Sequence, residues 1–464
     1  MPDCDHVLFV SSGMSAPKKR DHILARRQQY LNYGALTLAT LLDRNGQPAI
    51  LAHGGHEDPS DFLEMLELKG LLPTRAPLML SLPSFFALPW AQDFYGLLRA
   101  RHPSQRIVAG GRWVTGPDPS WLKERLPVDR VVTGLAEHQI MDLAAGRPPS
   151  RGISETLPDF SLDHRLTLAF ETFQPSIETS RGCGMGCAFC EERAIKLTRL
   201  RSPEVLANFF LETCRQYGST DIHPYLQSSF FLPNPRWAAD FSAEVKQRGV
   251  RLQWRCETRV DGLKPQTIEM LAAAGMKVID LGLETASPRQ AQAMNKSPNV
   301  ERYLSSASEV LRACEANGVW AKVNVLLYAG ETTETYEETR EWLHRHSSAI
   351  KGVSVGPVIV FGPPSQARPL LRQLEVLGAA AADPSDTDRT GISRLNLSAE
   401  IGHPEAEAMS LALSREFMDI DDYFDLKSFS YYPRGYSRAD FDRDVAASDP
   451  DTLPFRVAKV IGAA

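Results

Sequence analysis

The chain has 464 residues, enough for two or three domains, with 43% hydrophobic and 23% charged residues, as in ordinary globular proteins. The formal net charge is −6, so the sequence lacks the excess of basic residues that is typical of nucleic-acid-binding proteins. The sequence shows no signal peptide and no apolar run of membrane-spanning length, and its seven cysteines are an odd number. We therefore expect a cytoplasmic protein without a disulfide framework and without nucleic-acid or membrane partners.

The first predicted domain covers residues 1–150. Short apolar runs alternate there with amphipathic stretches, which predicts an α/β fold with a doubly wound parallel sheet of flavodoxin or Rossmann type. Such sheets bind ligands at the carboxyl ends of their strands. The predicted strands are His6–Ser11, Pro48–Ala52, Pro77–Ser81, Arg106–Gly110 and Arg130–Thr133.

A segment rich in Pro, Gly and Ser, from about Gly146 to Pro158, predicts a domain boundary. Residues 151–365 again alternate between strand-like and helix-like stretches, which predicts a second α/β domain. Residues 366–464 are expected to form a small C-terminal extension that covers a substrate.

Three cysteines of the second domain, Cys183, Cys187 and Cys190, stand four and three residues apart on a glycine-rich loop. The loop follows a predicted buried strand, Pro175–Thr179. Thiolates bind iron, and three of them leave one iron of an iron–sulfur cubane open to another ligand. A structural zinc site, the main alternative, usually has paired cysteine knuckles and a fourth ligand nearby, and we find none in the sequence.

The loop Cys183-x3-Cys187-x2-Cys190, with Phe189 directly before its last cysteine, resembles the signature of the radical S-adenosylmethionine (SAM) superfamily. This resemblance implies a [4Fe-4S] cluster held by the three cysteines, with SAM on the open iron and Gly186 and Phe189 beside the cofactors. An electron donor such as flavodoxin or ferredoxin would drive cleavage of SAM to a 5′-deoxyadenosyl radical, which abstracts hydrogen from a substrate carbon. The resemblance also implies a partial (β/α)6 barrel of TIM type.

The stretch Lys277–Ser287 resembles the fourth barrel strand of that superfamily, in which Glu284 and Ser287 would contact SAM. Strand parity places Asp280 on the same face as Glu284, where an unpaired carboxylate would be costly, so we expect it to have a partner. Lys322 and Asn324 lie on one face of the predicted fifth strand. They are candidates for that partner or for the lining of the SAM site.

Catalytic candidates cluster on the predicted third strand, Leu252–Arg259, and beyond it. Because side chains alternate along a strand, Glu257 and Cys256 face opposite sides, and the sequence does not tell which side is the interior. Glu257, Asp261 and Asp280 are candidate acid or base groups by location. Cys256 is a candidate hydrogen-atom donor, with a packed core thiol as the alternative.

The order of segments in residues 1–150 resembles the cobalamin-binding domain that precedes the radical SAM domain in one branch of the superfamily. Gly110–Thr115 stands where that branch has Gly-Gly-Pro-His-x-Thr. Two departures matter: Arg112 and Trp113 add bulk to the glycine turn, and no Asp-x-His-x-x-Gly motif supplies a lower cobalt ligand. Cobalamin therefore stays open as a cofactor.

Two reactions are compatible with these features. Without cobalamin, the chain resembles the radical SAM diol dehydratases of aminoglycoside biosynthesis, which implies loss of water from a 1,2-diol of a paromamine-type amino sugar and a downstream reductase as partner. The acidic run Arg415–Asp425 and the aromatic cluster Phe429–Tyr432 suit a cationic amino sugar, although a solvated helix face is the favoured explanation of the acidic run. We take dehydration as the main prediction.

With cobalamin bound, the alternative is a C-methyltransferase of natural-product biosynthesis. A third hypothesis is a non-catalytic iron–sulfur electron carrier. Carriers normally ligate every iron, and a barrel with SAM-type landmarks would be superfluous to one, which disfavours this hypothesis.

Overall fold

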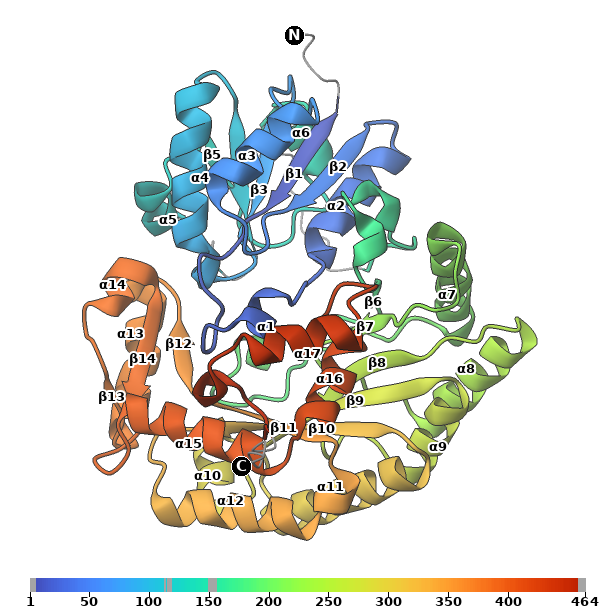
Figure 1. Cartoon of the computed structure of the whole chain (residues 1–464), viewed down its shortest axis with the longest axis vertical. Helices are drawn as coiled ribbons and strands as arrows, with labels where there is room; N and C mark the ends of the chain where they lie inside the picture. Colours follow the sequence, from blue (N-terminus) through green and yellow to red (C-terminus); the bar gives the residue numbers. More distant parts are fainter. Residues whose placement is uncertain (1–5, 112–113, 115–118, 149–156, 458–464) are drawn as a thin grey trace, which may run out of the picture. The chain divides into compact units, whose positions relative to one another are not determined.

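The structure is a computed structural model that describes residues 6–111, 114, 119–148 and 157–457 (Figure 1). The chain divides into two compact units, where the sequence predicted three consecutive domains. The first unit consists of Met1–Phe173, Phe361–Ala367 and Ser385–Ile392, and the second of Gln174–Val360, Arg368–Pro384 and Ser393–Ala464. The first unit thus extends beyond the boundary expected near residue 150, and the expected C-terminal extension contributes to both units.

The first unit contains a five-stranded parallel sheet in the order β2-β1-β3-β4-β5. This is the strand order of flavodoxin-type sheets, so the predicted doubly wound α/β domain is confirmed. Its strands are β1 (Val7–Ser11), β2 (Ala49–His53), β3 (Leu78–Ser81), β4 (Ile107–Gly110) and β5 (Arg130–Val131). Its helices are α1 (Ile23–Arg26), α2 (Tyr33–Arg44), α3 (Pro59–Leu68), α4 (Leu88–Arg101), α5 (Ser120–Arg125), α6 (Ile140–Ala144) and α14 (Asp386–Thr390).

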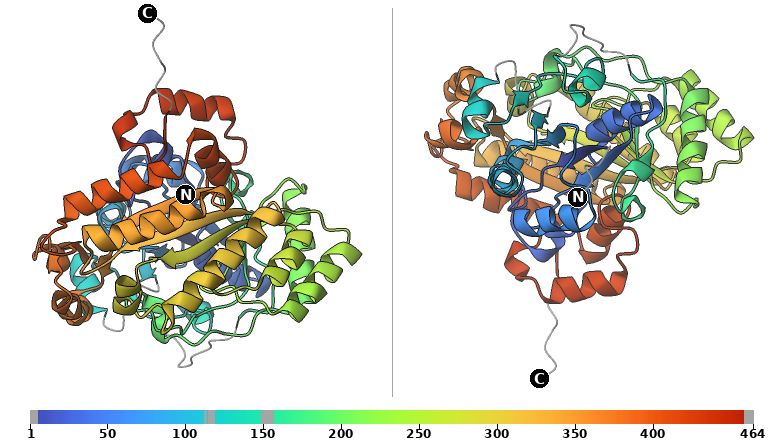
Figure 2. Two further views of the ribbon diagram at one scale, coloured as in Figure 1. Left: turned by 90° about the horizontal axis from the view of Figure 1, so that it is seen from below. Right: turned by 90° about the horizontal axis from the view of Figure 1, so that it is seen from above.

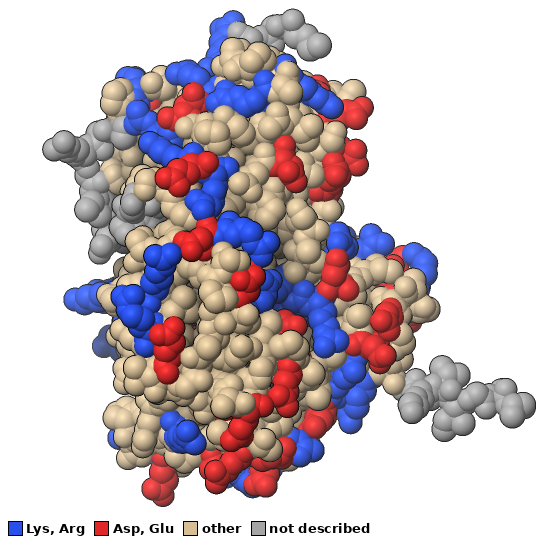
Figure 3. Space-filling view, turned by 90° about the vertical axis from the view of Figure 1, so that its left-hand side faces the viewer, with Lys and Arg blue, Asp and Glu red and all other residues tan. Residues whose placement is uncertain are grey.

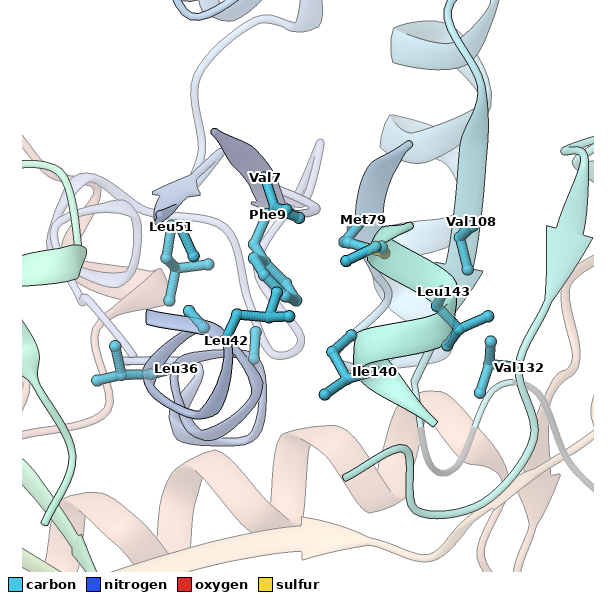
Figure 4. Packing of buried hydrophobic residues seen from close by; sticks show 14 of the residues in the cluster. Val7, Phe9, Leu36, Leu42, Leu51, Met79, Val108, Val132, Ile140 and Leu143 are labelled. Carbon is cyan, nitrogen blue, oxygen red and sulfur yellow. The ribbon is translucent and has the colours of Figure 1, made fainter. Parts of the chain in front are cut away.

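Apolar side chains on one face of this sheet pack against α2 and α6 (Figure 4). Phe9 and Leu51 on the strands meet Leu36 and Leu42 of α2, and all four are at most 2% exposed. Helix α2 begins at Asn32, whose side chain accepts a hydrogen bond from the backbone N–H of Ala35. This packing holds α2 and α6 against one face of the sheet. Because all strands of the sheet are parallel, their carboxyl ends lie at one edge.

The second unit contains a six-stranded parallel sheet in the order β11-β10-β9-β8-β7-β6, with helices along its outer face (Figure 2). It is the predicted partial (β/α)6 barrel. Its strands are β6 (Ser176–Glu178), β7 (Tyr225–Gln227), β8 (Trp254–Arg259), β9 (Met276–Glu284), β10 (Trp320–Leu327) and β11 (Gly352–Pro357). Its helices are α7 (Pro203–Tyr217), α8 (Pro235–Gln247), α9 (Pro265–Ala273), α10 (Pro288–Ala293), α11 (Val300–Ala316) and α12 (Thr333–Arg345).

The C-terminal residues add a small three-stranded sheet in the order β12-β14-β13 and a group of helices. These elements are β12 (Ile359–Phe361), α13 (Pro364–Val376), β13 (Ala380–Ala381), β14 (Ile392–Asn396), α15 (His403–Glu416), α16 (Ile420–Ser428) and α17 (Arg438–Ala446).

Burial along β10 shows which side of the barrel sheet faces inward. Ala321, Val323 and Val325 are at most 5% exposed, whereas Lys322 and Asn324 between them keep intermediate exposure. Because successive side chains point to opposite faces of a strand, the buried set packs against the helices and the polar set faces the barrel interior. The barrel interior is therefore lined by polar side chains.

Charged side chains of both signs are interspersed on the face shown in Figure 3. Among the described residues, every helix is too short or too polar to cross a membrane.

Candidate active site

The loop that follows β6 carries the three predicted iron ligands, and its backbone is held in a left-handed path by glycine. Gly182, Gly184 and Gly186 all have φ between 70° and 77°, a range that glycine adopts without strain. A Cβ atom on Gly182 would lie 2.4 Å from the carbonyl oxygen of Lys196, so no other residue fits there. The glycines thus let the loop bend tightly at the carboxyl end of the strand.

Backbone hydrogen bonds fix each end of this loop. The N–H of Cys183 donates to the carbonyl of Ile195 (2.9 Å), and the N–H of Ala188 donates to the carbonyl of Met294 (2.8 Å). The side chain of Asn295 donates to the carbonyl oxygen of Gly186 (2.8 Å). The predicted cofactor residue Gly186 is therefore tied to the segment after β9.

The cysteines differ in exposure: Cys187 is 6% exposed, while Cys183 and Cys190 are partly exposed. Burial raises the pKa of the Cys190 thiol to about 11 and also raises that of Cys183. Metal binding would therefore have to displace protons from these thiols. No three His, Cys, Asp or Glu side chains in the described part of the chain are arranged to hold a single metal ion.

Arg259, the last residue of β8, reaches the cysteine loop. Its Nη1 donates to Sγ of Cys187 (3.2 Å), and its Nη2 donates to the carbonyl oxygen of Lys296 (2.7 Å). Asp261 accepts two hydrogen bonds from the same guanidinium, at 2.9 and 3.0 Å. Asp261, predicted as an acid or base candidate, is thus committed to orienting Arg259, and we do not retain it as a catalytic group.

Glu284, at the carboxyl end of β9, has a left-handed backbone with φ of 62°. A left-handed backbone is uncommon for residues other than glycine and is often found at functional sites. Its Oε1 accepts a hydrogen bond from Nζ of Lys296 (3.3 Å), and that ammonium group lies 5.9 Å from the ring centre of Phe189. The predicted cofactor residues Glu284 and Phe189 therefore lie close to each other, beside the cysteine loop.

Ser287 is fully buried, and its hydroxyl oxygen has no hydrogen-bond partner in the structure. Unpaired buried polar atoms are costly, so a bound ligand that pairs with this hydroxyl would relieve the cost. This observation fits the predicted role of Ser287 beside SAM.

Asp280 forms the centre of a buried ion network inside the barrel. Arg255 donates to both of its carboxylate oxygens, at 2.6 and 2.8 Å, and Nζ of Lys322 donates to Oδ1 at 2.8 Å. Desolvation alone would raise the pKa of Asp280, but the charges of Arg255 and Lys322 outweigh it and hold the pKa well below its usual range. The expectation that Asp280 has a partner is confirmed, and its fixed charge makes it a poor proton donor or acceptor.

The same contacts show that Lys322 is one of the partners of Asp280, while a place of Lys322 and Asn324 in the lining of the SAM site stays a prediction. Nζ of Lys322 donates to Asp280 and also to Oδ1 of Asn324 (3.0 Å). Both residues belong to the ion network in the barrel interior.

Cys256 faces away from that interior. Its thiol is fully buried and lies 3.8 Å from Sδ of Met276, and Trp254 on the same face packs against Phe241 of α8. The hypothesis that Cys256 donates a hydrogen atom is therefore wrong, and the core-thiol alternative holds. The inward set on β8 is Arg255, Glu257 and Arg259.

The acidic and aromatic C-terminal segments contact the opposite end of the barrel from the cysteine loop. Asp422 and Asp425 of α16 pair with Lys351, which precedes β11, at 2.7 and 2.9 Å. The ring of Phe429 stacks on His223, just before β7, with centroids 4.2 Å apart. These segments lie at the amino ends of the strands, where the ring of Tyr431 lies 4.7 Å from the guanidinium of the inward residue Arg255. That they cover a substrate stays a prediction.

The carboxyl edge of the sheet in the first unit also has unpaired buried polar atoms. They are Oγ of Ser12 after β1, Nδ1 of His53 at the end of β2, and Oγ of Ser84 after β3. Among the described residues, none places an atom within 4 Å of a Cβ added to Gly110, at the end of β4. The edge thus offers polar atoms and space to a ligand, while Arg112, Trp113 and Thr115 of the expected glycine turn lie outside the described residues.

Residues 177–343, from β6 into α12, match the sequence model of the radical SAM superfamily. The second unit contains a radical SAM domain. Membership of this domain in the superfamily implies a [4Fe-4S] cluster and SAM as cofactors.

Two curated proteins similar to part of this chain carry methyltransferase names. An uncharacterized methyltransferase of Pyrococcus horikoshii is 26% identical over 264 residues, which cover 50% of this chain and 56% of that protein. The hopanoid C-2 methylase of Rhodopseudomonas palustris is 28% identical over 177 residues, covering 36% of this chain and 32% of that protein. The matches thus span about half and about a third of the length of these two relatives.

Two solved structures are similar in fold to both the sheet unit and the radical SAM domain. The radical SAM methyltransferase TsrM of Kitasatospora setae superposes with a TM-score of 0.57 at 16% identity, covering 76% of this chain and 73% of that one. The cobalamin-dependent radical SAM enzyme OxsB, solved with aqua-cobalamin, has a TM-score of 0.56 at 17% identity, covering 74% of this chain and 53% of that one. At these identities the likeness concerns the fold.

Sequence reasoning missed the contacts that hold the loop of the radical SAM domain. Parity had placed Arg259 on the same face as Glu257, but nothing in the sequence indicated that it contacts Cys187. Asn295 and Lys296, which follow the predicted fourth strand, were not assigned a role from the sequence. These residues could have been predicted from their positions at or just after the ends of barrel strands, because strand ends that are far apart in sequence converge at the carboxyl edge of a barrel.

Proposed function

We propose that this chain is a cobalamin-dependent radical SAM methyltransferase that modifies a carbon atom of a small molecule. The observation that carries the proposal is the pairing, in one chain, of a three-cysteine loop at the carboxyl edge of a partial barrel with a flavodoxin-type sheet whose carboxyl edge has unpaired buried polar atoms. The methyltransferase names of the curated relatives support the same reaction class.

In this proposal Cys183, Cys187 and Cys190 hold the cluster, and Glu284 and Ser287 bind SAM. When bound, the cluster supplies the electron that cleaves SAM, and cobalamin supplies the methyl carrier. Arg259 keeps Cys187 in place and contributes a positive charge beside its sulfur. A small electron-transfer protein such as flavodoxin or ferredoxin is the proposed reductant.

Cobalamin is proposed to bind at the carboxyl edge of the first unit. Ser12, Ser84 and His53 would pair there with polar groups of the ligand, and Gly110 would leave it room. Burial lowers the pKa of His53 to about 4, so its imidazole is neutral at physiological pH. Asn32 stabilises this edge by donating to Oγ of Ser11 and of Ser81, each at 3.0 Å.

Methylation is preferred here over diol dehydration. The dehydratase prediction drew on the chain length, the altered cobalamin motifs and the acidic C-terminal region, and that region pairs with Lys351 at the amino ends of the barrel strands. None of the relatives described above has a dehydratase name. The methyltransferase is therefore the reaction that we carry forward.

The first experiment is to produce the full chain with cobalamin supplied, purify it without oxygen, and measure iron and cobalt per chain. We expect roughly four irons, as for one cubane, and near-stoichiometric cobalt. After reduction in the presence of SAM and a methyl acceptor, S-adenosylhomocysteine and 5′-deoxyadenosine should both form. Iron without cobalt, together with 5′-deoxyadenosine as the only SAM product, would contradict the methyltransferase.

A matched pair of variants tests the cobalamin edge. Gly110→Phe places a ring in the open space at the end of β4 and should lower cobalt per chain severalfold while iron stays constant. Gly96→Phe is the control, because Gly96 lies on α4 and an added Cβ also meets no atom within 4 Å. Equal cobalt in the two variants would place the ligand elsewhere.

A further inference from the structure

Three inward-facing side chains lie at one level across the middle strands of the barrel. Glu257 of β8 is in register with Asp280 of β9, and Asp280 is in register with Lys322 of β10. The next inward level toward the carboxyl edge consists of Arg259, Gly282 and Asn324. Inward side chains of such barrels stack in layers of this kind.

The charges in the lower level are unevenly paired. Asp280 accepts three hydrogen bonds from Arg255 and Lys322. Glu257, beside it, has one long contact, in which the hydroxyl of Tyr225 donates to Oε2 at 3.4 Å. Glu257 is exposed, whereas Arg255 and Arg259 on the same strand face are at most 7% exposed. The carboxylate of Glu257 is therefore available to a molecule inside the barrel.

Glu257 also lies close to the proposed site of chemistry. It is two residues from Arg259 on the same face of β8, which corresponds to about 7 Å along a strand. Arg259 contacts Sγ of Cys187 directly. A molecule that touches Glu257 and extends toward the carboxyl edge thus approaches the cysteine loop.

The side chain of Glu284 lies above Asp280 on the same path. Gly282 occupies the next inward position on β9, and an added Cβ there would lie 2.7 Å from Oε1 of Glu284. The carboxylate of Glu284 therefore lies over Gly282, one level closer to the carboxyl edge than Glu257. Desolvation by the surrounding protein raises the pKa of Glu257 to about 7, with the charge of Asp280 adding to the effect, so the carboxylate is mostly charged above that pH.

We propose that Glu257 is a substrate-binding residue and that the substrate is a polar small molecule that places a hydroxyl or amino hydrogen-bond donor on its carboxylate. This inference rests on the proposed function, whose substrate class it names. Hydrogen bonds to a charged acceptor are worth enough to make binding about tenfold or more tighter than that of a hydrocarbon of the same shape. Arg255 and Lys322 keep Asp280 from competing for the same donor.

The test uses three probes of closely matched shape: benzyl alcohol, benzylamine and ethylbenzene. Their dissociation constants are measured by ligand-observed NMR on the full chain, with cluster reconstituted, SAM present and no reductant. The variants are Glu257→Leu, which removes the acceptor, and Glu257→Gln, which keeps an acceptor oxygen without charge. Glu269→Gln, at an exposed position on α9, is the control.

We expect the alcohol or the amine to bind wild type and Glu269→Gln at least about tenfold more tightly than ethylbenzene. In Glu257→Leu, the ratio of the dissociation constant of ethylbenzene to that of the polar probe should fall close to one. Glu257→Gln should preserve the ratio for a neutral hydroxyl and lose it for an ammonium group, which identifies the donor. Iron content and the thermal midpoint of each variant verify that it is folded.

Ethylbenzene binding as tightly as both polar probes would overturn the proposal, and so would an unchanged ratio in Glu257→Leu. Because the measurement involves no turnover, it is independent of the reaction. Absence of cobalt or of S-adenosylhomocysteine would contradict the methyltransferase proposal. It would not affect the measured preference of the barrel for polar over apolar probes.

Discussion

Arg259 donates from Nη1 to Sγ of Cys187 across 3.2 Å and so joins the end of β8 to the cysteine loop. The guanidinium is held from the other side by Asp261 and by the carbonyl oxygen of Lys296. A fixed cation and N–H donor beside a cluster-ligating sulfur affects the cluster in two ways. It positions the ligand, and it stabilises added negative charge on reduction.

Replacing Arg259 with Gln should therefore lower the reduction potential of the cluster, by an amount on the order of tens of millivolts. The reduced cluster has one more negative charge, and the variant lacks the cation that stabilises it. A reductive titration followed by EPR measures the potential without substrate.

Two further variants separate charge from positioning in this contact. Asp261→Asn keeps the guanidinium but weakens its orientation, so a smaller shift in the same direction is expected. Arg259→Lys keeps the charge with a less rigid donor and should recover part of the potential. A wild-type potential in Arg259→Gln at full iron content would show that the contact has no electrostatic effect.

The cysteine assignment predicts that replacing Cys183, Cys187 or Cys190 with Ala removes most of the iron and abolishes formation of 5′-deoxyadenosine. Cys314 is fully buried on α11, and Cys214 is partly buried on α7. Ala at either of these positions should leave iron per chain unchanged. Full iron and SAM cleavage in the Cys187 variant would refute the ligand set.

Much of the fold followed from local patterns in the sequence. Each predicted strand of both parallel sheets matches a strand of the structure to within a few residues, because buried parallel strands are continuous apolar runs bounded by turn residues. The loop Cys183–Cys190 was found for a related reason, since ligand spacing and glycines are local. Strand alternation also placed Asp280 on the face of Glu284, and it grouped Lys322 with Asn324 as candidate partners of Asp280.

What the sequence did not reveal depends on contacts between distant segments. Cys256 and Glu257 are equally plausible from sequence, and only the packing of Trp254 against α8 shows that the Cys256 face is the outer one. The C-terminal aromatic cluster suggested a substrate cover. Its place at the amino ends of the strands depends on the stacking of Phe429 on His223, 206 residues away.

Removal of the charge at the centre of the barrel network should destabilise the second unit. In Asp280→Asn, Arg255 and Lys322 would be left without a counter-charge, and breaking a buried pair in this way costs about 3–5 kcal/mol. The thermal midpoint should fall by roughly ten degrees. Differential scanning calorimetry on the apo chain measures it.

A control and a rescue make the Asp280 result specific. Glu337→Gln breaks an exposed pair with Arg340 and should change stability by less than about 1 kcal/mol. Adding Lys322→Met to Asp280→Asn removes one unpaired cation and should restore part of the midpoint. A double variant less stable than Asp280→Asn would mean that Lys322 contributes by packing and not through its charge.

Glu331, in the turn between β10 and α12, predicts a pH dependence of stability. It is 2% exposed, and its carboxyl group accepts hydrogen bonds from the hydroxyl of Thr335 (2.5 Å) and the backbone N–H of Tyr328 (3.2 Å). Desolvation raises its pKa from 4.5 to about 7. Between these values the folded chain binds more protons than the unfolded chain, so stability falls as pH rises through this range.

Glu331→Gln removes this titration while keeping an acceptor for Thr335. Wild type should lose up to about 3 kcal/mol relative to the variant between about pH 4.5 and pH 7, with no further difference above that range. Glu257 titrates with the same sign, but it is present in both proteins and cancels in the comparison. Thermal midpoints at a series of pH values measure the difference, and Glu334→Gln in the first turn of α12 is the control. Parallel profiles for wild type and Glu331→Gln would mean that Glu331 is already ionised in the folded protein across this range.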